Sequence, residues 1–163
     1  MKYFIILLFL LPKSFAYGDD LNERIIWFNE AQWGLSAEIE TAKYEKLEEL
    51  MGKLGQLWLR RDGALGSEVA PFITKIVTKE PNAVFVWFQR HPKDYSVFVE
   101  DIQYFVFTDY NGDKEEVKKL EQLRIKTISA CRSFALTSES KEIGELAKSL
   151  ESKLSSIVVR AID

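Results

Sequence analysis

The segment from Pro81 to Tyr110 constrains the fold most strongly, because it concentrates large aromatic rings. It holds nine of the chain's aromatic residues, which number 4 Trp, 6 Tyr and 11 Phe in all. Each such ring removes about 150–250 Å² of surface from water when it is buried. We therefore expect most of this segment to lie in the hydrophobic core. The nine residues are Phe85, Trp87, Phe88, Tyr95, Phe98, Tyr104, Phe105, Phe107 and Tyr110.

The spacing of apolar residues in this segment predicts two helices. Six of them recur at the i, i+3, i+4, i+7 spacing of a helical stripe, namely Tyr95, Phe98, Val99, Ile102, Phe105 and Val106. Pro81 and Pro92 suit the first turn of a helix, where the missing N–H costs nothing. We expect helices at 82–91 and 93–107. Because Phe, Val and Tyr also favour strands, a β-hairpin across 81–107 is the alternative.

The first sixteen residues have the layout of a secretory signal peptide. An apolar run at 3–11 is followed by small residues, Ser14 and Ala16, at the positions that a signal peptidase reads. The run is about half the length of about 20 residues that a membrane span needs. We expect export to the periplasm or the exterior, with no membrane anchor after cleavage, and one helical domain at 17–163.

Charge excludes some classes of partner. Residues 1–16 carry two of the 22 basic residues, so 20 basic residues remain against 25 acidic ones, a net charge of about −5. Nucleic-acid binders show a basic stripe, and attachment to anionic membranes needs a polybasic segment. This balance favours neither, and it is compatible with a protein partner that has a basic surface.

Start and stop residues divide the first part of the domain into two helices. The first is expected at 21–33, ended by Gly34, and the second after a Ser36 cap to about Arg60. Gly52 and Gly55 lie inside the second helix and each cost about 1 kcal/mol relative to Ala. They either allow another element to approach closely or mark a break.

The later helices are separated by two turns. The segment 61–67 is expected as a loop, with Ser67 capping the next helix. Asp113, with Glu116 as its partner in a capping box, begins a long helix to about Ala135. Thr137 or Ser138 caps the last helix, whose apolar seam reaches Val158.

These elements predict an all-α single domain of about six to seven helices. They group into helical hairpins at 21–60, 68–107 and 114–160, a spacing of about 40 residues that suits a HEAT-like array. An orthogonal bundle fits the same elements.

Residues with reactive side chains are few. His91, the only histidine, is expected at a helix end, where it interacts with the last carbonyls. Cys131, the only cysteine, lies on an apolar stripe and is expected in the core. We predict no catalytic residue, cofactor site or metal site, and no enzyme activity.

The acidic turn at 109–113 resembles the opening of a calcium-binding loop. Such a loop needs Gly at its sixth position and Glu at its twelfth, and this chain has Lys114 and Leu120 there. We therefore expect a turn and a helix cap.

Two other functions stay open. Adjacent carboxylates occur at Glu48/Glu49, Glu100/Asp101 and Glu115/Glu116, and an exported hydrolase acting on sugars would need two facing carboxyl groups. A small-molecule carrier would need a cavity among the central aromatic rings. Neighbouring acids on a helix point in different directions, which makes the hydrolase the weaker prediction.

Recognition of another protein is the leading hypothesis. Tyr110 stands in a turn beside Asp109 and Asp113 and is the aromatic residue that we most expect to be exposed. Such a loop suits a basic partner, since tyrosine is enriched in binding hot spots and charge speeds association. The four tryptophans, Trp27, Trp33, Trp58 and Trp87, are expected in the core, and a role as interface anchors is the alternative. Arg60 and Arg61 offer a second contact. An immunity or inhibitor protein that blocks a toxin or a cell-wall enzyme is one such function.

Overall fold

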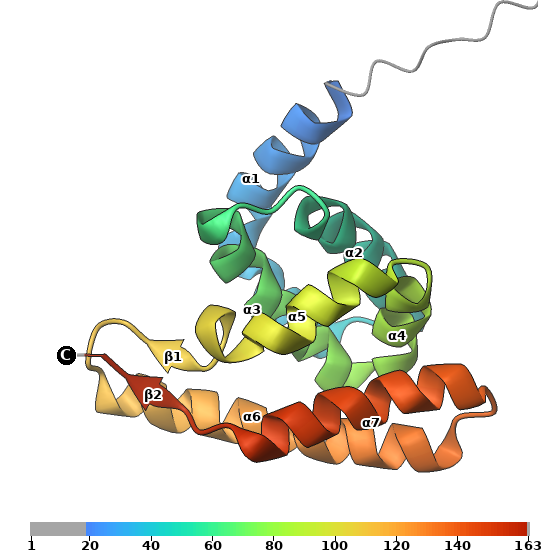
Figure 1. The fold of residues 1–163 in the computed structure, drawn as a ribbon. Helices are drawn as coiled ribbons and strands as arrows, with labels where there is room; N and C mark the ends of the chain where they lie inside the picture. The colour runs from blue at the N-terminus through green and yellow to red at the C-terminus, as the bar shows by residue number, and fades with distance from the viewer. Residues whose placement is uncertain (1–18, 163) are drawn as a thin grey trace, which may run out of the picture.

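The computed structural model describes residues 19–162, which form seven helices and one pair of short strands (Figure 1). The predicted signal peptide and its cleavage site lie outside these residues. The all-α, single-domain prediction is confirmed. The elements are α1 (Asp19–Thr41), α2 (Tyr44–Trp58), α3 (Gly63–Lys79), α4 (Pro81–Gln89), α5 (Pro92–Phe105), β1 (Thr108–Asp109), α6 (Lys114–Thr137), α7 (Lys141–Ser156) and β2 (Arg160–Ala161).

Helix α3 lies at the centre of the fold and packs against α1, α2, α4, α5 and α6. Its inward face is fully buried and carries Val69, Ala70, Ile73, Ile76 and Val77. In a helical-repeat array each hairpin contacts only its neighbours. A helix with five packing partners favours the bundle over the array.

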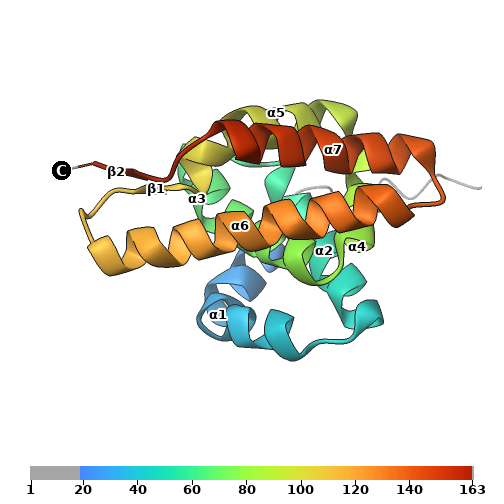
Figure 2. The same ribbon diagram turned by 90° about the horizontal axis from the view of Figure 1, so that it is seen from below.

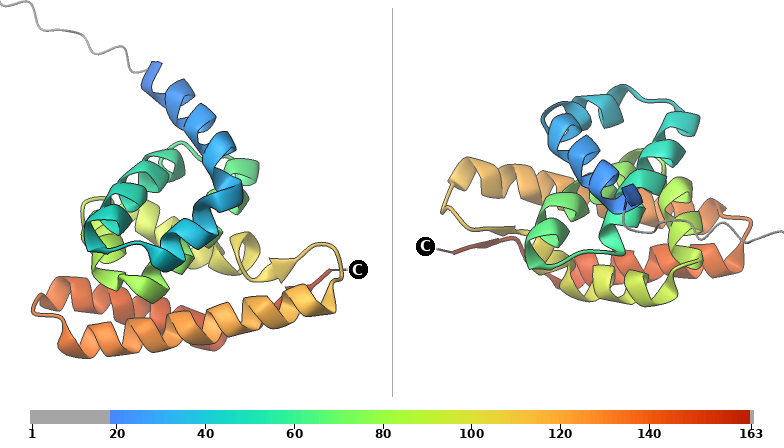
Figure 3. Two further views of the ribbon diagram at one scale, coloured as in Figure 1. Left: turned by 180° about the vertical axis from the view of Figure 1, so that it is seen from behind. Right: turned by 90° about the horizontal axis from the view of Figure 1, so that it is seen from above.

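Helices α6 and α7 form an antiparallel pair along one side of the bundle (Figure 2). The N-terminal half of α1 extends away from this pair, on the opposite side of the molecule (Figures 1 and 3). Helix α6 also packs against α3 and α4.

The aromatic segment folds as two helices, so the hairpin alternative is wrong. Pro81 and Pro92 occupy the first positions of α4 and α5. Phe88 and Phe98 are no more than 1% exposed, and their ring centroids are 5.1 Å apart. Trp58 of α2 joins them at 5.4 Å from Phe98. These rings form the core that the sequence predicts.

The first helix boundary differs from the prediction. Helix α1 continues through Gly34 and Ser36, and the chain breaks only at residues 42–43. Leu35 and Ile39 are fully buried on the same face as Phe28. Burial of one such side chain stabilises the fold by about 1.5–3 kcal/mol, whereas a glycine inside a helix costs about 1 kcal/mol. Burial therefore decides the boundary.

Two predicted caps are also wrong. Helix α3 begins at Gly63, because Asp62 accepts a hydrogen bond from the Leu65 N–H at 2.8 Å, while the Ser67 hydroxyl donates to Gly63 O at 3.0 Å inside the helix. Helix α7 begins at Lys141 with Ser140 as its cap. In both cases another residue with a side-chain oxygen caps the helix.

The pair of strands was not predicted. β2 runs parallel to β1, with Arg160 N donating to Phe107 O at 3.0 Å and Ile162 N to Asp109 O at 2.9 Å. The last helix therefore ends at Ser156, and Val158 is exposed instead of continuing the seam. Strands of two residues have no side-chain period that a sequence pattern can reveal.

Candidate functional site

The predicted partner-binding residues fall at opposite ends of α5. Arg61 Nη1 lies 2.8 Å from Asp94 Oδ1 in the first turn of α5, and Tyr110 Oη donates to Tyr104 O in its last turn at 3.1 Å. Ten residues of helix separate Asp94 from Tyr104, about 15 Å at 1.5 Å per residue. The two groups therefore do not form one surface.

Arg61 joins α2 to α5. Its guanidinium donates to Trp58 O at 2.7 Å and lies 4.2 Å from the centroid of the Trp58 ring, in addition to the ion pair with Asp94. The Arg61 side chain is largely buried, and both of its hydrogen bonds are made by Nη1. Arg60 beside it is exposed.

Asp109 faces into its own loop. It is only 4% exposed, and its carboxylate accepts hydrogen bonds from Asn111 N at 3.2 Å and Asp113 N at 2.6 Å. Gly112 adopts φ = 67°, a left-handed conformation that glycine tolerates best. Asp109 thus stabilises the turn, and Tyr110 and Asp113 are the two of the three predicted residues that stay on the surface.

Asp113 caps α6 as predicted, but without the reciprocal half of a capping box. Its carboxylate accepts from Glu115 N at 2.8 Å and Glu116 N at 3.4 Å. The Asp113 N–H donates to Asp109 rather than to Glu116, whose carboxylate instead lies 3.1 Å from Lys119 Nζ. The turn and the start of α6 are therefore connected by side-chain hydrogen bonds.

Around this turn lies an exposed aromatic patch, which we call the tyrosine surface. It surrounds a hollow of about 190 Å³, and Tyr104, Tyr110 and Ile162 are 54%, 48% and 50% exposed. The tyrosine rings meet edge to face with centroids 5.8 Å apart. The surface consists of Glu100, Asp101, Tyr104, Tyr110, Arg160 and Ile162.

The sequence analysis identified only Tyr110 of these six residues as a contact for a partner. Tyr104 falls outside the apolar stripe of α5, which is a signal of exposure that the sequence contained. Ile162 joins the surface only through the unpredicted β2 pairing. Desolvation, with a contribution from Tyr104, raises the pKa of Tyr110 above its ordinary value, so its hydroxyl stays neutral at physiological pH.

Trp33 is the exception among the tryptophans that were expected in the core. The residue is 89% exposed, which is more than the 48% of Tyr110. Trp33 shares the outer face of α1 with Ile26, which lies seven residues earlier and is 57% exposed. Trp58 is fully buried as predicted, and Trp27 and Trp87 are partly buried.

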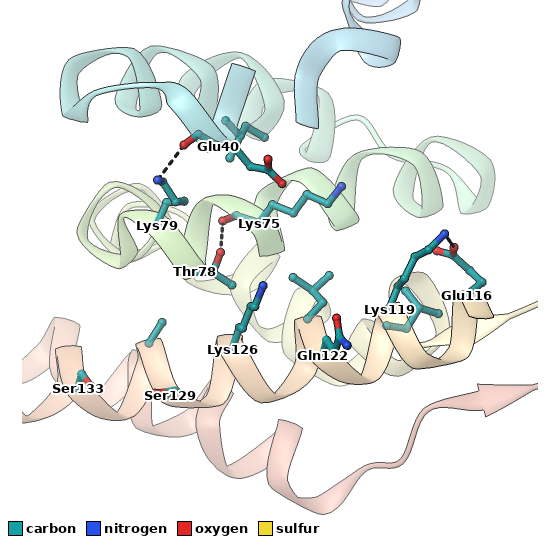
Figure 4. A pocket seen from close by; sticks show the side chains of 14 residues that line it. Glu40, Lys75, Thr78, Lys79, Glu116, Lys119, Gln122, Lys126, Ser129 and Ser133 are labelled. Atoms are coloured by element: carbon teal, nitrogen blue, oxygen red, sulfur yellow. Dashed lines mark hydrogen bonds and ion pairs between the residues drawn. The ribbon is translucent and has the colours of Figure 1, made fainter. Parts of the chain in front are cut away.

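A second concave feature is a groove between α1, α3 and α6, shown in Figure 4, which we call the lysine groove. It encloses about 820 Å³. Its charged lining residues are Glu40, Lys75, Lys79, Glu116, Lys119 and Lys126.

No family model, curated protein or solved structure matches the chain. Its function is therefore inferred from these two surfaces and from the state of its reactive groups.

Within residues 19–162, no helix combines the length and the apolar character needed to cross a bilayer.

The side chains of His91 and Cys131, the only histidine and the only cysteine of the chain, are held in place by packing contacts. The His91 ring stacks on Trp87 with centroids 4.1 Å apart, at the end of α4 where it was expected. Cys131 is fully buried as predicted, and burial raises the pKa of its thiol to about 12. A protonated, inaccessible thiol is a poor nucleophile.

Two of the adjacent carboxylate pairs have local partners. Glu49 Oε1 lies 2.7 Å from Lys53 Nζ, and Glu48 accepts a hydrogen bond from Tyr44 at 2.7 Å. Glu115 lies 2.7 Å from Lys118 in the same way, as Glu116 does beside Lys119. Across the described residues, no three His, Cys, Asp or Glu side chains gather in a group that could hold a metal ion.

Proposed function

We propose that the chain is a small exported protein-binding protein, and that a basic partner docks on the tyrosine surface. The observation that carries this proposal is the cluster of Tyr104, Tyr110 and Ile162, each about half exposed around one hollow. Binding hot spots are enriched in tyrosine, and a hollow bordered by two tyrosine rings provides a pocket for a side chain of the partner.

The tyrosine surface is already ordered before binding. The hydrogen bonds of Asp109 fix the turn, and Tyr110 Oη donates to Tyr104 O. A tyrosine has only two side-chain torsions to fix, and a preorganised surface loses less conformational entropy on association. More of the contact energy therefore remains as affinity.

Charge favours a basic partner. Glu100 and Asp101 are exposed in the last two turns of α5, against one basic residue, Arg160, in the lining of the hollow. The C-terminal end of a helix carries partial negative charge, which adds to these carboxylates. Asp113 lies exposed in the adjoining turn. Complementary charge at an interface raises the association rate and selects among partners.

The signal peptide predicted at residues 1–16 supports a location of this interaction in the periplasm or outside the cell. A partner whose enzymatic or toxic activity is lost on binding would make the chain an inhibitor or immunity protein. The buried thiol and the ring-stacked histidine agree with a role in binding rather than in catalysis.

The experiment compares capture of the partner by variants of the tagged mature chain, residues 17–163. Tyr104→Ala and Tyr110→Ala should each weaken binding about thirtyfold, the loss of about 2 kcal/mol that defines a hot spot. Tyr44→Ala is the matched control, because Tyr44 is also an exposed tyrosine but lies on α2. The purified partner is then titrated by calorimetry at two salt concentrations.

Two outcomes would reject the proposal. One is a partner that binds both tyrosine variants as tightly as it binds the wild type and Tyr44→Ala. The other is an affinity that rises with salt, because attraction to a basic partner weakens when salt screens it.

A further inference from the structure

The lysine groove has a charge opposite to that of the whole chain. Four lysines and two glutamates line it, whereas the chain carries 25 acidic against 22 basic residues. Two of the lysines come from α3 and two from α6, so both of these helices contribute basic side chains to the lining (Figure 4).

The two α3 lysines are oriented by neutral acceptors. Lys75 Nζ donates to Ser36 Oγ at 2.6 Å, and Lys79 Nζ donates to the backbone oxygen of Glu40 at 2.9 Å. A hydroxyl or a carbonyl fixes the position of an ammonium group without cancelling its charge. Both side chains therefore keep their charge available to a ligand.

The α6 wall supplies a further positive charge. Lys119 is neutralised by Glu116 at 3.1 Å, but Lys126 is exposed and projects from α6 toward α3 in Figure 4. Within residues 19–162, no hydrogen bond or ion pair holds the Lys126 ammonium. Lys126 thus projects into the groove from α6, and Lys75 and Lys79 line its α3 side with their ammonium groups directed toward α1.

The rest of the lining suits a chain with polar groups along its length. Gln122, Ser129 and Ser133 follow one another along α6 and offer hydrogen bonds, and Ile39, Leu120, Leu123 and Ala130 offer apolar contacts. The lining of α6 runs from Glu116 to Ser133. These 17 helical steps of 1.5 Å make the groove about 25 Å long.

We propose that the lysine groove binds an extended acidic peptide segment of another protein. An extended chain advances about 3.3–3.6 Å per residue, so the groove holds about seven residues. Carboxylates spaced along such a segment meet Lys75 and Lys79 on one side and Lys126 on the other. The groove shares no residue with the tyrosine surface, so the two proposals stand or fall separately.

The test measures fluorescence anisotropy of a labelled octapeptide that alternates Glu with Ala and Leu, titrated with the mature chain at low salt. Lys126→Glu should weaken binding about fivefold or more, because one attraction between exposed charges becomes a repulsion. Lys118→Glu is the matched control. It makes the same charge change on the same helix, but Lys118 does not line the groove and pairs with Glu115.

Three results would overturn the proposal. Lys126→Glu and Lys118→Glu could weaken binding equally, which would indicate attraction by net charge alone. A peptide with Gln in place of Glu could bind as well as the acidic one, which would remove charge as the cause. Citrate could displace the peptide and bind more tightly, which would make the groove a site for a small anion.

Discussion

Substitution of Gly55 by Ala tests how closely α2 and α4 are packed. A Cβ atom at Gly55 would lie 2.3 Å from Cε2 and 2.5 Å from Cζ2 of Trp87, and 2.8 Å from its Nε1. At Gly52, on the same helix, a Cβ atom meets nothing within 4 Å. The sequence left open whether these glycines allow a close approach or mark a break. Gly55 allows the approach, and α2 is unbroken at both.

The expected change in the free energy of unfolding follows from two opposing contributions. Ala is more favourable than Gly inside a helix by about 1 kcal/mol, so Gly52→Ala should stabilise the protein by up to that amount. Carbon atoms pack best at about 3.5–4.0 Å, so the Trp87 ring must move by more than about 1 Å to accept Gly55→Ala. Overpacking of this kind costs about 1–3 kcal/mol.

Trp87 does not move freely. Its ring stacks on His91 at 4.1 Å between centroids and meets Phe88 edge to face at 5.1 Å. The helix-propensity gain is common to both variants and cancels in their difference. Gly55→Ala should therefore be less stable than Gly52→Ala by about 1–3 kcal/mol.

Urea unfolding followed by tryptophan fluorescence measures this difference. In a Trp87→Ala background the clash is removed, so Gly55→Ala should there become as favourable as Gly52→Ala, and a double-mutant cycle gives the coupling energy. Equal stability of the two glycine variants in the wild-type background would refute the reasoning. It would mean that the Trp87 ring leaves its place at no cost.

Two further predictions concern the acidic turn at 109–113 and the buried side chains of Cys131 and Tyr95. Asp109→Ala should lower the free energy of unfolding by about 2 kcal/mol, because two N–H groups lose their acceptor. Asp113→Ala should cost about 1 kcal/mol as the loss of a helix cap. Thermal unfolding compares them, and a smaller effect at Asp109 would contradict its assignment as the residue that holds the turn. Stability should also fall as pH rises from about 9 to about 12. Burial raises the pKa of Cys131 from 9.0 to about 12, and it raises the pKa of Tyr95 above its ordinary 10.0. The unfolded chain therefore loses these protons at a lower pH than the folded chain, which favours unfolding. Each group contributes a slope of up to about 1.4 kcal/mol per pH unit, and a Cys131→Ala variant with an unchanged slope would contradict this cause.

The sequence predicted those elements whose signals are local. The apolar stripe of α5 recurs over about three turns, and Pro92 occupies the first position of the helix, so periodicity and the helix start agree. Boundaries that depend on tertiary burial were missed. In the sequence Gly34 indicates the end of a helix, but in the fold Leu35 is buried and α1 continues. Ser67 indicates a helix cap, but Gly66 before it already lies in α3 and packs against Phe105, where a Cβ atom added at Gly66 would lie 2.8 Å from Cε1 of the ring.

The two surfaces differ in how much of each is predictable. The exposure of Tyr110 follows from its turn, but the inward orientation of Asp109 follows from hydrogen bonds that only the folded turn makes. The lysine groove joins Lys75 and Lys126, which are 51 positions apart. Each looks in the sequence like a solvated residue on its own helix, and only the packing of α3 against α6 brings them to one groove.

The two proposed sites are connected through α6, because Asp113 caps the helix along which the groove runs. Lys126 lies 13 residues beyond Asp113, about 20 Å along the helix. This is more than twice the Debye length of about 8 Å at physiological salt, so the charge at Lys126 is screened from the tyrosine surface. Lys126→Glu should therefore leave the affinity for a basic partner unchanged. If Lys126→Glu did change the affinity for that partner at physiological salt, the cause would be a change in α6 itself. Hydrogen exchange of the α6 amides would then differ between Lys126→Glu and the wild type.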